Sequence, residues 1–187
     1  MLNCFVAHGC DRGYKHRYNR IYEPIFSPLR DEPLQILEVG IYKGAGIAAW
    51  LDYFPNASVF GIDTFQRIKP AQVPVLAHQR VGWCKGDSTT INLEGEFDLI
   101  FDDGDHAAST QLATFKNLYP QLKKGGVYFI EDVFPVDELS AAELKNHGKW
   151  VSPLADYHAL LAGLPSYELR NLRAISAPDS CLLEITK

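Results

Sequence analysis

The sequence lacks several features that mark particular classes of protein. No hydrophobic run among its 187 residues is long enough to cross a bilayer, so we expect no membrane association. The first residues have neither the basic start nor the apolar core of a secretory signal. The four cysteines form no Cys-x-x-Cys pair and no zinc-ligand spacing, so we interpret them as reduced thiols of a cytoplasmic protein.

Positive charge is also scarce. Lys and Arg number 18 against 23 Asp and Glu, which gives a formal net charge of -5 at pH 7. The densest basic segment, residues 12–20, is interleaved with aromatic side chains and is interpreted as a solvated helix face. No stretch is basic enough to follow a phosphate backbone, so nucleic acid is not an expected partner.

Short apolar segments alternate with helical patterns along the chain. This order predicts one α/β domain over residues 1–187, with a mostly parallel sheet and a helical segment or lid over residues 1–33. The five expected parallel strands cover residues 34–40, 57–63, 79–87, 96–103 and 125–133. Helices are expected over residues 18–26, 45–54, 108–122, about 135–147 and 153–161. Two further apolar runs, residues 166–176 and 180–187, predict an antiparallel hairpin joined by a short loop.

A glycine-rich loop follows the first expected strand. Glu38, Gly40 and Gly44 form the pattern Glu-x-Gly-x-x-x-Gly just before a helix. Glycine lets the backbone approach a ligand closely, and the helix N-terminus presents unpaired N–H groups. A tight turn with no ligand would give the same pattern. The spacing differs from the Gly-x-Gly-x-x-Gly of a dinucleotide site, which disfavours an NAD-dependent oxidoreductase.

Acidic residues end the next two expected strands. Asp63 is placed to accept hydrogen bonds from ribose hydroxyls, and Asp87 is placed to meet an adenine amino group. Either one alone could be an ordinary loop aspartate. Together with Glu38 they stand at three successive strand ends, and open α/β sheets bind ligands in the crevice at that edge.

Carboxylates are crowded after the fourth and fifth strands. Asp102, Asp103 and Asp105 follow one strand, and Glu131 and Asp132 follow the other. Neighbouring strands run about 4.8 Å apart, so the two groups would face one crevice and repel each other. A hard cation with oxygen ligands removes that repulsion. The cluster therefore predicts Mg²⁺, with Mn²⁺ also suitable, at Asp103, Glu131 and Asp132.

Helix capping is the competing explanation for some of these acids. Asp105, or Ser109, could cap the following helix, and a capping or orienting role is expected for Asp105. Asp102 suits the cation less well because neighbouring strand residues point in opposite directions, and we assign it to the cofactor site. His106 could accept a proton from an activated hydroxyl, or could be a solvent-exposed histidine at a helix start.

The residue series Glu38, Gly40, Gly44, Asp63 and Asp87 resembles the class I methyltransferases that bind S-adenosylmethionine. The terminal hairpin is similar to the last two strands of that fold. The resemblance implies a Rossmann-like, mostly parallel seven-stranded sheet with a C-terminal antiparallel hairpin and helices on both faces. Fold alone does not fix the methyl acceptor.

Two motifs, "FDDGDH" at residues 101–106 and "GGVYFIEDV" at residues 125–133, resemble a narrower group. It comprises the metal-dependent sugar O-methyltransferases of macrolide biosynthesis and their cephalosporin hydroxylase-like relatives. The resemblance implies Asp103, Glu131 and Asp132 as magnesium ligands, His106 as the catalytic base, and a homo-oligomer. Asp105 stands where the macrolide enzymes have serine.

Residues 8–26 resemble the N-terminal Gly-Thr-Asp-Lys-Gly motif of the same group. This resemblance implies that an aromatic side chain of the segment closes over the cofactor, from among Tyr14, His16, Tyr18 and Tyr22. The alternative is that aromatic residues at helical spacing pack in the core.

The sequence therefore predicts an S-adenosylmethionine-dependent, Mg²⁺-dependent O-methyltransferase acting on a hydroxyl of a small molecule or sugar. A catechol or phenol O-methyltransferase would use the same metal and is one alternative. A domain that binds the cofactor without catalysis is another, and a metal-dependent hydrolase would leave the glycine loop unexplained. Base N-methylation is disfavoured because the Asp/Asn-Pro-Pro motif is absent after the fourth strand.

Overall fold

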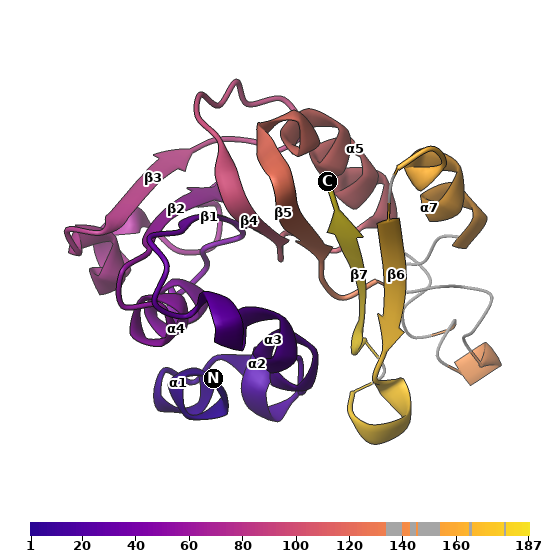
Figure 1. The fold of residues 1–187 in the computed structure, drawn as a ribbon, viewed down its shortest axis with the longest axis horizontal. Coiled ribbons are helices and arrows are strands. Elements are labelled where there is room, and N and C mark those ends of the chain that lie inside the picture. The colour runs from indigo at the N-terminus through magenta and orange to yellow at the C-terminus, as the bar shows by residue number, and fades with distance from the viewer. Residues whose placement is uncertain (134–139, 143–144, 146–153, 165, 178) are drawn as a thin grey trace.

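The computed structural model describes residues 1–133, 140–142, 145, 154–164, 166–177 and 179–187. A seven-stranded sheet with the order β3-β2-β1-β4-β5-β7-β6 forms its centre (Figure 1). The strands are β1 (Gln35–Val39), β2 (Ser58–Asp63), β3 (Val81–Lys85), β4 (Phe97–Asp102), β5 (Leu122–Ile130), β6 (Ser166–Asn171) and β7 (Cys181–Thr186). Neighbours from β3 to β5 are parallel, and β7 runs antiparallel to both β5 and β6. The predicted fold class is confirmed.

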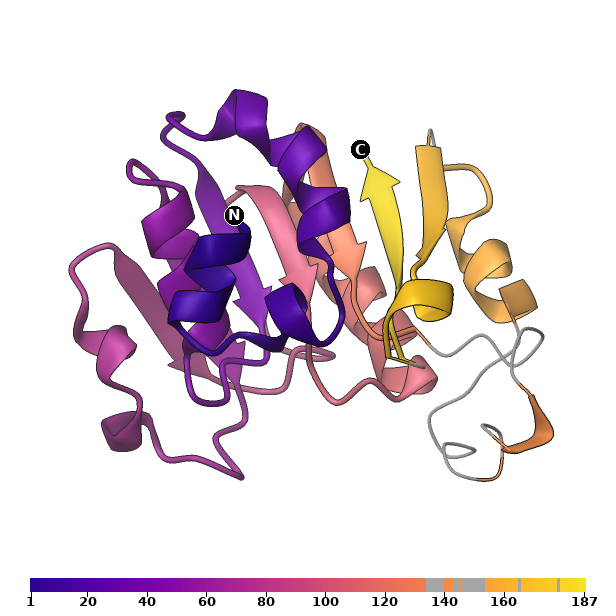
Figure 2. The ribbon, with the colours of Figure 1, turned by 90° about the horizontal axis from the view of Figure 1, so that it is seen from below.

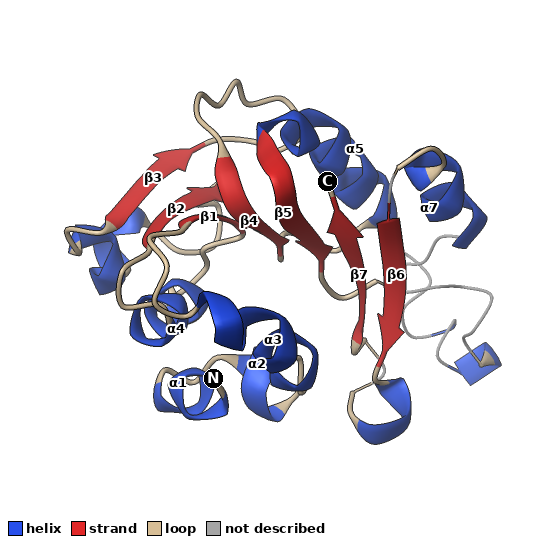
Figure 3. Cartoon of the chain, in the orientation of Figure 1, coloured by secondary structure: helices blue, strands red, loops and turns tan. Residues whose placement is uncertain are grey.

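Helices cover both faces of this sheet (Figure 3). The α-helices are α1 (Leu2–Ala7), α2 (Asp11–Tyr14), α3 (Asn19–Phe26), α4 (Ala45–Tyr53), α5 (Ala108–Leu118) and α7 (Leu154–Leu161). Short 3₁₀ helices cover Ser27–Leu29, Pro70–Gln72, Pro74–Ala77, Tyr119–Gln121 and Arg173–Ile175. Helices α1 to α4 lie on one face, and α5 and α7 lie on the other. No helix in the described part of the chain is both long and apolar enough to span a bilayer.

The N-terminal helices cover the middle strands of the sheet, as the view from below shows (Figure 2). An aromatic core fills the space beneath them. The rings of Trp50 and Phe101 stack with centroids 4.3 Å apart, and Tyr22 meets Phe129 edge-on at 5.0 Å. Phe5 from α1 packs edge-on against Trp50 at 5.1 Å. These contacts bury large apolar areas and fix the N-terminal segment onto the sheet.

The alternation of side chains along each strand determines the face of the sheet on which each acidic side chain lies. Glu38 pairs in register with Phe101, and Phe101 pairs with Phe129. Side chains two residues apart share a face of the sheet. Asp103 and Glu131 each lie two residues beyond one of these phenylalanines. The three carboxylates therefore lie on the face that the N-terminal helices cover.

The elements depart from the predictions in few places. Strand β6 ends at Asn171, before the predicted limit at residue 176, because Arg173–Ile175 form a 3₁₀ turn. The connection to β7 is therefore longer than the predicted short loop. The helix predicted at about residues 135–147 falls largely outside the described residues. No disulfide joins Cys4, Cys10, Cys84 or Cys181 in the described part of the chain.

Candidate active site

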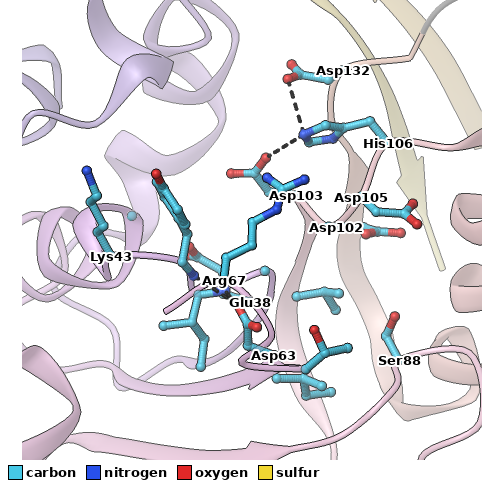
Figure 4. Close-up of a pocket in the computed structure, with 18 of the residues that line it drawn as sticks. Glu38, Lys43, Asp63, Arg67, Ser88, Asp102, Asp103, Asp105, His106 and Asp132 are labelled. Atoms are coloured by element: carbon cyan, nitrogen blue, oxygen red, sulfur yellow. Dashed lines mark hydrogen bonds and ion pairs between the residues drawn. The ribbon is translucent and has the colours of Figure 1, made fainter. Parts of the chain in front are cut away.

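A cavity of about 1050 Å³ opens at the carboxyl ends of β1, β2, β4 and β5 (Figure 4). It collects most of the residues that the sequence singled out: Glu38, Gly40, Asp63, Asp87, Asp102, Asp103, Asp105, His106 and Asp132. Glu131 and Gly44 are the two predicted site residues that do not line it. Both the glycine loop and most of the acidic cluster therefore face one space, as the strand order requires.

Contacts within the protein explain why the two predicted loop positions, Gly40 and Gly44, are occupied by glycine. Gly40 has φ +91°, and a Cβ atom there would lie 2.0 Å from the carbonyl oxygen of Asp103. Gly44 has φ +81°, and its Cβ would lie 2.5 Å from a methyl group of Val75. Both positions demand glycine because a side chain would be strained and would clash. The turn therefore brings the ends of β1 and β4 together beside the cavity.

Asp63 holds this loop in place. Its Oδ2 accepts hydrogen bonds from the backbone N–H groups of Ile41 and Tyr42, both at 2.9 Å. Its Oδ1 accepts from the N–H of Phe65 at 2.6 Å. The predicted ribose contact would use the remaining acceptor capacity of this carboxylate. The structure thus gives Asp63 a loop-organising role that the sequence did not indicate.

Asp87 lies at the cavity edge near the end of β3. Its Oδ1 accepts from the N–H of Thr89 at 2.9 Å and from the Thr89 hydroxyl at 2.7 Å. These hydrogen bonds lower the pKa of Asp87 because they favour the ionised carboxylate. Oδ2 remains as an acceptor facing an exposed part of the site.

Asp103, His106 and Asp132 form a compact group of side chains of the types that can bind a metal ion. One candidate ligand atom from each lies within 4.8 Å of those of the others. The Nε2 atom of His106 is 4.0 Å from Oδ1 of Asp103 and 3.8 Å from Oδ2 of Asp132 (Figure 4). Burial raises the pKa of Asp103 to about 6 and also raises the pKa of Asp132. Two neighbouring carboxylates with raised pKa values are difficult to ionise together. A divalent cation bound between them would stabilise the ionised form of both.

Backbone strain accompanies this group. His106 has φ +61° and Asp132 has φ +53°, and both lie in the left-handed region that favours glycine. Such conformations typically cost about 1–3 kcal/mol each and concentrate at functional sites. The Nδ1 atom of His106 is buried and has no hydrogen-bond partner among the described residues. The strained backbone turns both side chains toward Asp103.

Glu131, a predicted metal ligand, contacts Arg12 and Tyr22 in this structure. Both of its oxygens accept hydrogen bonds from Nε of Arg12 at 2.8 Å, and Oε1 accepts from the hydroxyl of Tyr22 at 2.6 Å. Arg12 also donates from Nη2 to Asp103 at 2.9 Å and lies 3.4 Å from Glu38. The arginine is 1% exposed. Its positive charge therefore compensates three carboxylates from three parts of the sheet.

The prediction of a solvated helix face at residues 12–20 is wrong for its key members. Arg12, His16 and Tyr18 are buried, because they face the carboxylates at the sheet edge. The Tyr18 hydroxyl donates to Oδ1 of Asp132 at 2.7 Å. Tyr14 is 62% exposed and lines the cavity. Of the four aromatic side chains predicted to close over a cofactor, Tyr14 alone combines exposure with the cavity wall.

A second group of ligand atoms, from His16, Asp132 and Asp179, also lies within 4.8 Å. Protein partners already occupy it. His16 Nδ1 lies 3.1 Å from the Ser180 hydroxyl, and Lys15 Nζ donates to Asp179 at 2.7 Å. Burial lowers the pKa of His16, but Asp11, Asp132 and Asp179 outweigh burial and the net shift is upward. Hydrogen bonds and ion pairs within the protein therefore already engage the side chains of this group.

Asp102 and Asp105 have different surroundings. Asp102 is buried on the opposite face of the sheet, and its Oδ2 has no hydrogen-bond partner within the described ranges. Burial, followed by the charge of Asp103, raises the pKa of Asp102 well above its ordinary value, which favours the neutral acid. Asp105 accepts from the N–H of Ala107 at 3.0 Å and from the Thr110 hydroxyl at 3.3 Å. Asp105 thus orients the start of α5, in line with its predicted role.

Arg12 is the functional residue that the sequence did not reveal. It is 119 positions from Glu131 along the chain, so no local pattern links the two. One feature of the sequence could have predicted a buried cation here. Strand alternation places Glu38, Asp103 and Glu131 on the same buried face, and buried carboxylates require a cation partner.

Comparison with known proteins places this site in a family. Residues 37–133 match a family model described as a methyltransferase domain, which covers just over half of the chain. The chain is 32% identical over 144 residues to 8-demethyl-8-(2-methoxy-alpha-L-rhamnosyl)-tetracenomycin-C 3'-O-methyltransferase of Streptomyces olivaceus. It is 26% identical over 133 residues to mycinamicin VI 2''-O-methyltransferase of Micromonospora griseorubida. The alignments cover 69% and 65% of this chain, but 35% and 33% of those relatives.

A solved structure extends the similarity to the whole chain. The MycE methyltransferase from the mycinamycin biosynthetic pathway, in complex with Mg and SAH, superposes with a TM-score of 0.72 at 18% identity. The match covers 99% of this chain and 53% of that protein. The likeness confirms the fold of all seven strands. This chain spans about half the length of that structure.

Proposed function

The chain belongs to the methyltransferase domain family, and on that premise we propose that it is an S-adenosylmethionine-dependent O-methyltransferase. The proposed acceptor is a hydroxyl group of a sugar or another small molecule. One observation carries this proposal. The glycine loop with Asp63 and the group formed by Asp103, His106 and Asp132 line the same cavity. A methyl donor and a hydroxyl acceptor can therefore meet there.

The donor end of the cavity is the glycine loop. S-adenosylmethionine, when bound, supplies a methyl group on a positively charged sulfur. Asp63 and Asp87 offer acceptor oxygens for ribose hydroxyls and for the adenine amino group. Asp102, whose pKa is raised by burial, also lines the cavity and is proposed to contact the donor. These residues hold and orient the donor, and alignment of the reacting atoms supplies much of the rate enhancement.

The acceptor end is the acidic group. Asp103, Glu131 and Asp132 would hold Mg²⁺ or Mn²⁺, which would stabilise negative charge that develops on the acceptor oxygen. His106 stands beside Asp103 and Asp132 and accepts the hydroxyl proton at Nε2. The bond between sulfur and methyl carbon breaks with its electron pair left on sulfur, and the bond between methyl carbon and acceptor oxygen forms. The acceptor leaves as a methyl ether, and the donor leaves as S-adenosylhomocysteine.

Relatives of the chain favour a sugar acceptor. Two of them are named for methylation of a rhamnosyl tetracenomycin and of mycinamicin VI, and a solved neighbour contains Mg and SAH. The alignments cover about a third of the length of those two relatives. We place the reaction in the cytoplasm, where the reduced cysteines suit the redox conditions, and expect a homo-oligomer.

A methyl-transfer assay tests the proposal. The full chain is incubated with S-adenosylmethionine carrying a labelled methyl group and with either a rhamnosyl glycoside or a catechol, in Mg²⁺ or in chelator. We expect Mg²⁺-dependent labelling of the glycoside. Labelling of the catechol alone would move the assignment to phenol methylation. Binding of the donor with no transfer to any hydroxyl compound would contradict the enzymatic assignment.

A further inference from the structure

We propose that Tyr18 is a positioning residue of the metal site, a role that rests on the proposed function. Its hydroxyl holds the backbone and the carboxylate of Asp132 in the conformation that turns one carboxylate oxygen toward His106. Asp103, Glu131 and Asp132 remain the proposed ligands of the divalent cation. Tyr18 acts on the cation only through Asp132.

The Tyr18 hydroxyl contacts Asp132 at two points. It donates to Oδ1 of the carboxylate at 2.7 Å and accepts from the backbone N–H of the same residue at 3.2 Å. Asp132 has φ +53°, a conformation that is unfavourable for a residue with a side chain and persists where surrounding contacts hold it. One hydroxyl therefore fixes both the strained backbone of Asp132 and the carboxylate that this backbone presents.

The two oxygens of the Asp132 carboxylate have different surroundings. Oδ1 accepts from Tyr18 and also lies 3.4 Å from Nδ1 of His16, whereas Oδ2 lies 3.8 Å from Nε2 of His106. Figure 4 shows the carboxylates of Asp132 and Asp103 both facing the His106 ring. Tyr18 thus engages one oxygen of Asp132 and leaves the other in the group that can bind a metal ion.

The position of Tyr18 is itself fixed by its neighbours. The side chain is fully buried, and its ring stacks on that of His16 with centroids 5.1 Å apart. The carbonyl oxygens of Asp179 and Cys181 lie 3.2 and 3.3 Å from the hydroxyl oxygen. A hydroxyl has a single hydrogen, and a charged carboxylate forms the stronger hydrogen bond, so the short contact to Asp132 is the one that Tyr18 donates.

Binding of Mn²⁺ alone to the full chain tests this role, with free Mn²⁺ measured by electron paramagnetic resonance. Tyr18→Phe removes the hydroxyl and keeps the buried ring. We expect this substitution to weaken Mn²⁺ binding roughly 10- to 100-fold, as loss of a group that orients a metal ligand does. Mn²⁺ binding within about twofold of the unmodified chain would overturn the proposal and leave the methyltransferase assignment intact.

Tyr53→Phe is the matched control. Tyr53 is also buried, and its hydroxyl also donates to a carboxylate, that of Glu23, at 3.0 Å. Neither residue lines the cavity. The control should therefore bind Mn²⁺ as the unmodified chain does. Equal losses in the two variants would mean that removal of any buried hydroxyl weakens the site, which would overturn the specific role of Tyr18.

A double-mutant cycle tests whether Tyr18 acts through Asp132. Tyr18→Phe combined with Asp132→Asn should weaken Mn²⁺ binding no more than Asp132→Asn alone, because the ligand that Tyr18 positions is already lost. Combined with Asp103→Asn, the same substitution should still weaken binding. Additive losses in the Asp132→Asn background would overturn the proposal.

Amide hydrogen exchange in the unmodified chain decides the question if Tyr18→Phe does not fold. The N–H of Asp132 donates to the buried Tyr18 hydroxyl, so it should exchange as slowly as the amides of β5. Exchange at the rate of a solvent-exposed amide would overturn the proposed hold on Asp132.

Binding measurements on the unmodified chain separate this role from the proposed function. A chain that binds S-adenosylmethionine but no Mn²⁺ would overturn the positioning role together with the metal dependence. Failure to bind either compound would contradict the proposed function itself.

Discussion

At the scale of single residues, the chemistry depends on where His106 stands. Its Nε2 lies 3.8 Å from Asp132 and 4.0 Å from Asp103, at the edge of a cavity that also holds the glycine loop. In the proposed function His106 accepts the acceptor's proton and takes no part in binding the donor. The residue should therefore affect the transfer step and leave donor binding unchanged.

His106→Gln tests this separation. The substitution keeps a polar side chain and removes the proton acceptor, so we expect the methyl-transfer rate to fall roughly 100- to 10,000-fold. The dissociation constant of S-adenosylmethionine, measured by calorimetry, should stay within about twofold of the unmodified chain's. Full retention of the rate would contradict the role of His106 as base.

Glu131 gives a pH-dependent prediction for protein stripped of metal. Burial raises its pKa to about 7 from an ordinary 4.5, despite the opposing charge of Arg12. The folded state thus binds this proton more tightly than the unfolded state, and stability rises as pH falls from above 7 toward 4.5. Between about pH 8 and about pH 6 the gain is about 1 kcal/mol, or roughly 3 °C in Tm.

The control for that measurement is Glu131→Gln, which has no proton to exchange. Thermal unfolding followed at both pH values should show a smaller rise for the variant than for the unmodified chain. Equal slopes would mean that the proton affinity of Glu131 does not change on folding.

The sequence predicted which acidic and histidine side chains lie in the candidate site, but it did not predict which side chains contact them. Asp103, Asp132 and His106 could be selected because their spacing after strand ends is visible in one dimension. Arg12 could not, because the contacts that define it join positions 12, 38, 103 and 131 through the folded sheet. The contact between Arg12 and Glu131 could not be predicted for the same reason.

At the scale of elements, the ends of β1 and β4 lie close together beside the site. Gly40 stands on one side and the carbonyl oxygen of Asp103 on the other, and no side chain fits between them. This contact sets the distance from the glycine loop to the acidic group. It therefore links donor and acceptor halves of the proposed site.

Gly40→Ala tests that contact against a matched control. Both Gly40 and Gly95 have positive φ, but a Cβ on Gly95 has no atom within 4 Å. Alanine at Gly95 should cost only backbone strain of about 1–3 kcal/mol. Alanine at Gly40 should cost at least about 2 kcal/mol more, because it also overpacks two strand ends. Equal losses of unfolding free energy, measured by denaturant titration, would contradict the close approach.

The parallel strands were predictable because buried strands of this kind are continuous apolar runs, and they appear within a few residues of their predicted limits. Strand β6 was predicted too long, since it ends at Asn171 and not at residue 176. The docking of α2 and α3 was not predictable. Their aromatic and basic side chains at residues 12–22 look amphipathic in isolation, and only the carboxylates of the sheet edge explain why they are buried. The hairpin turn was predicted too short because the Arg173–Ile175 turn has no sequence signature.

At the scale of the whole molecule, the N-terminal helices are part of the site. Phe5 packs on Trp50, and Arg12, Tyr18 and Tyr22 contact the acids at the ends of β4 and β5. We therefore predict that residues 1–187 unfold as a single cooperative unit. Far-ultraviolet circular dichroism and tryptophan fluorescence should give coincident thermal transitions. An earlier fluorescence transition would mean that the N-terminal helices separate from the sheet before it unfolds.

The central claim is that this cavity binds a methyl donor, and calorimetric titration of metal-stripped protein with S-adenosylmethionine tests it most directly. The titration is run with and without Mg²⁺, and NAD serves as the control ligand. We predict saturable binding of S-adenosylmethionine and no comparable binding of NAD. Retention of that binding without Mg²⁺ would assign the acidic group to the acceptor, as proposed. Absence of S-adenosylmethionine binding under both conditions would contradict the account.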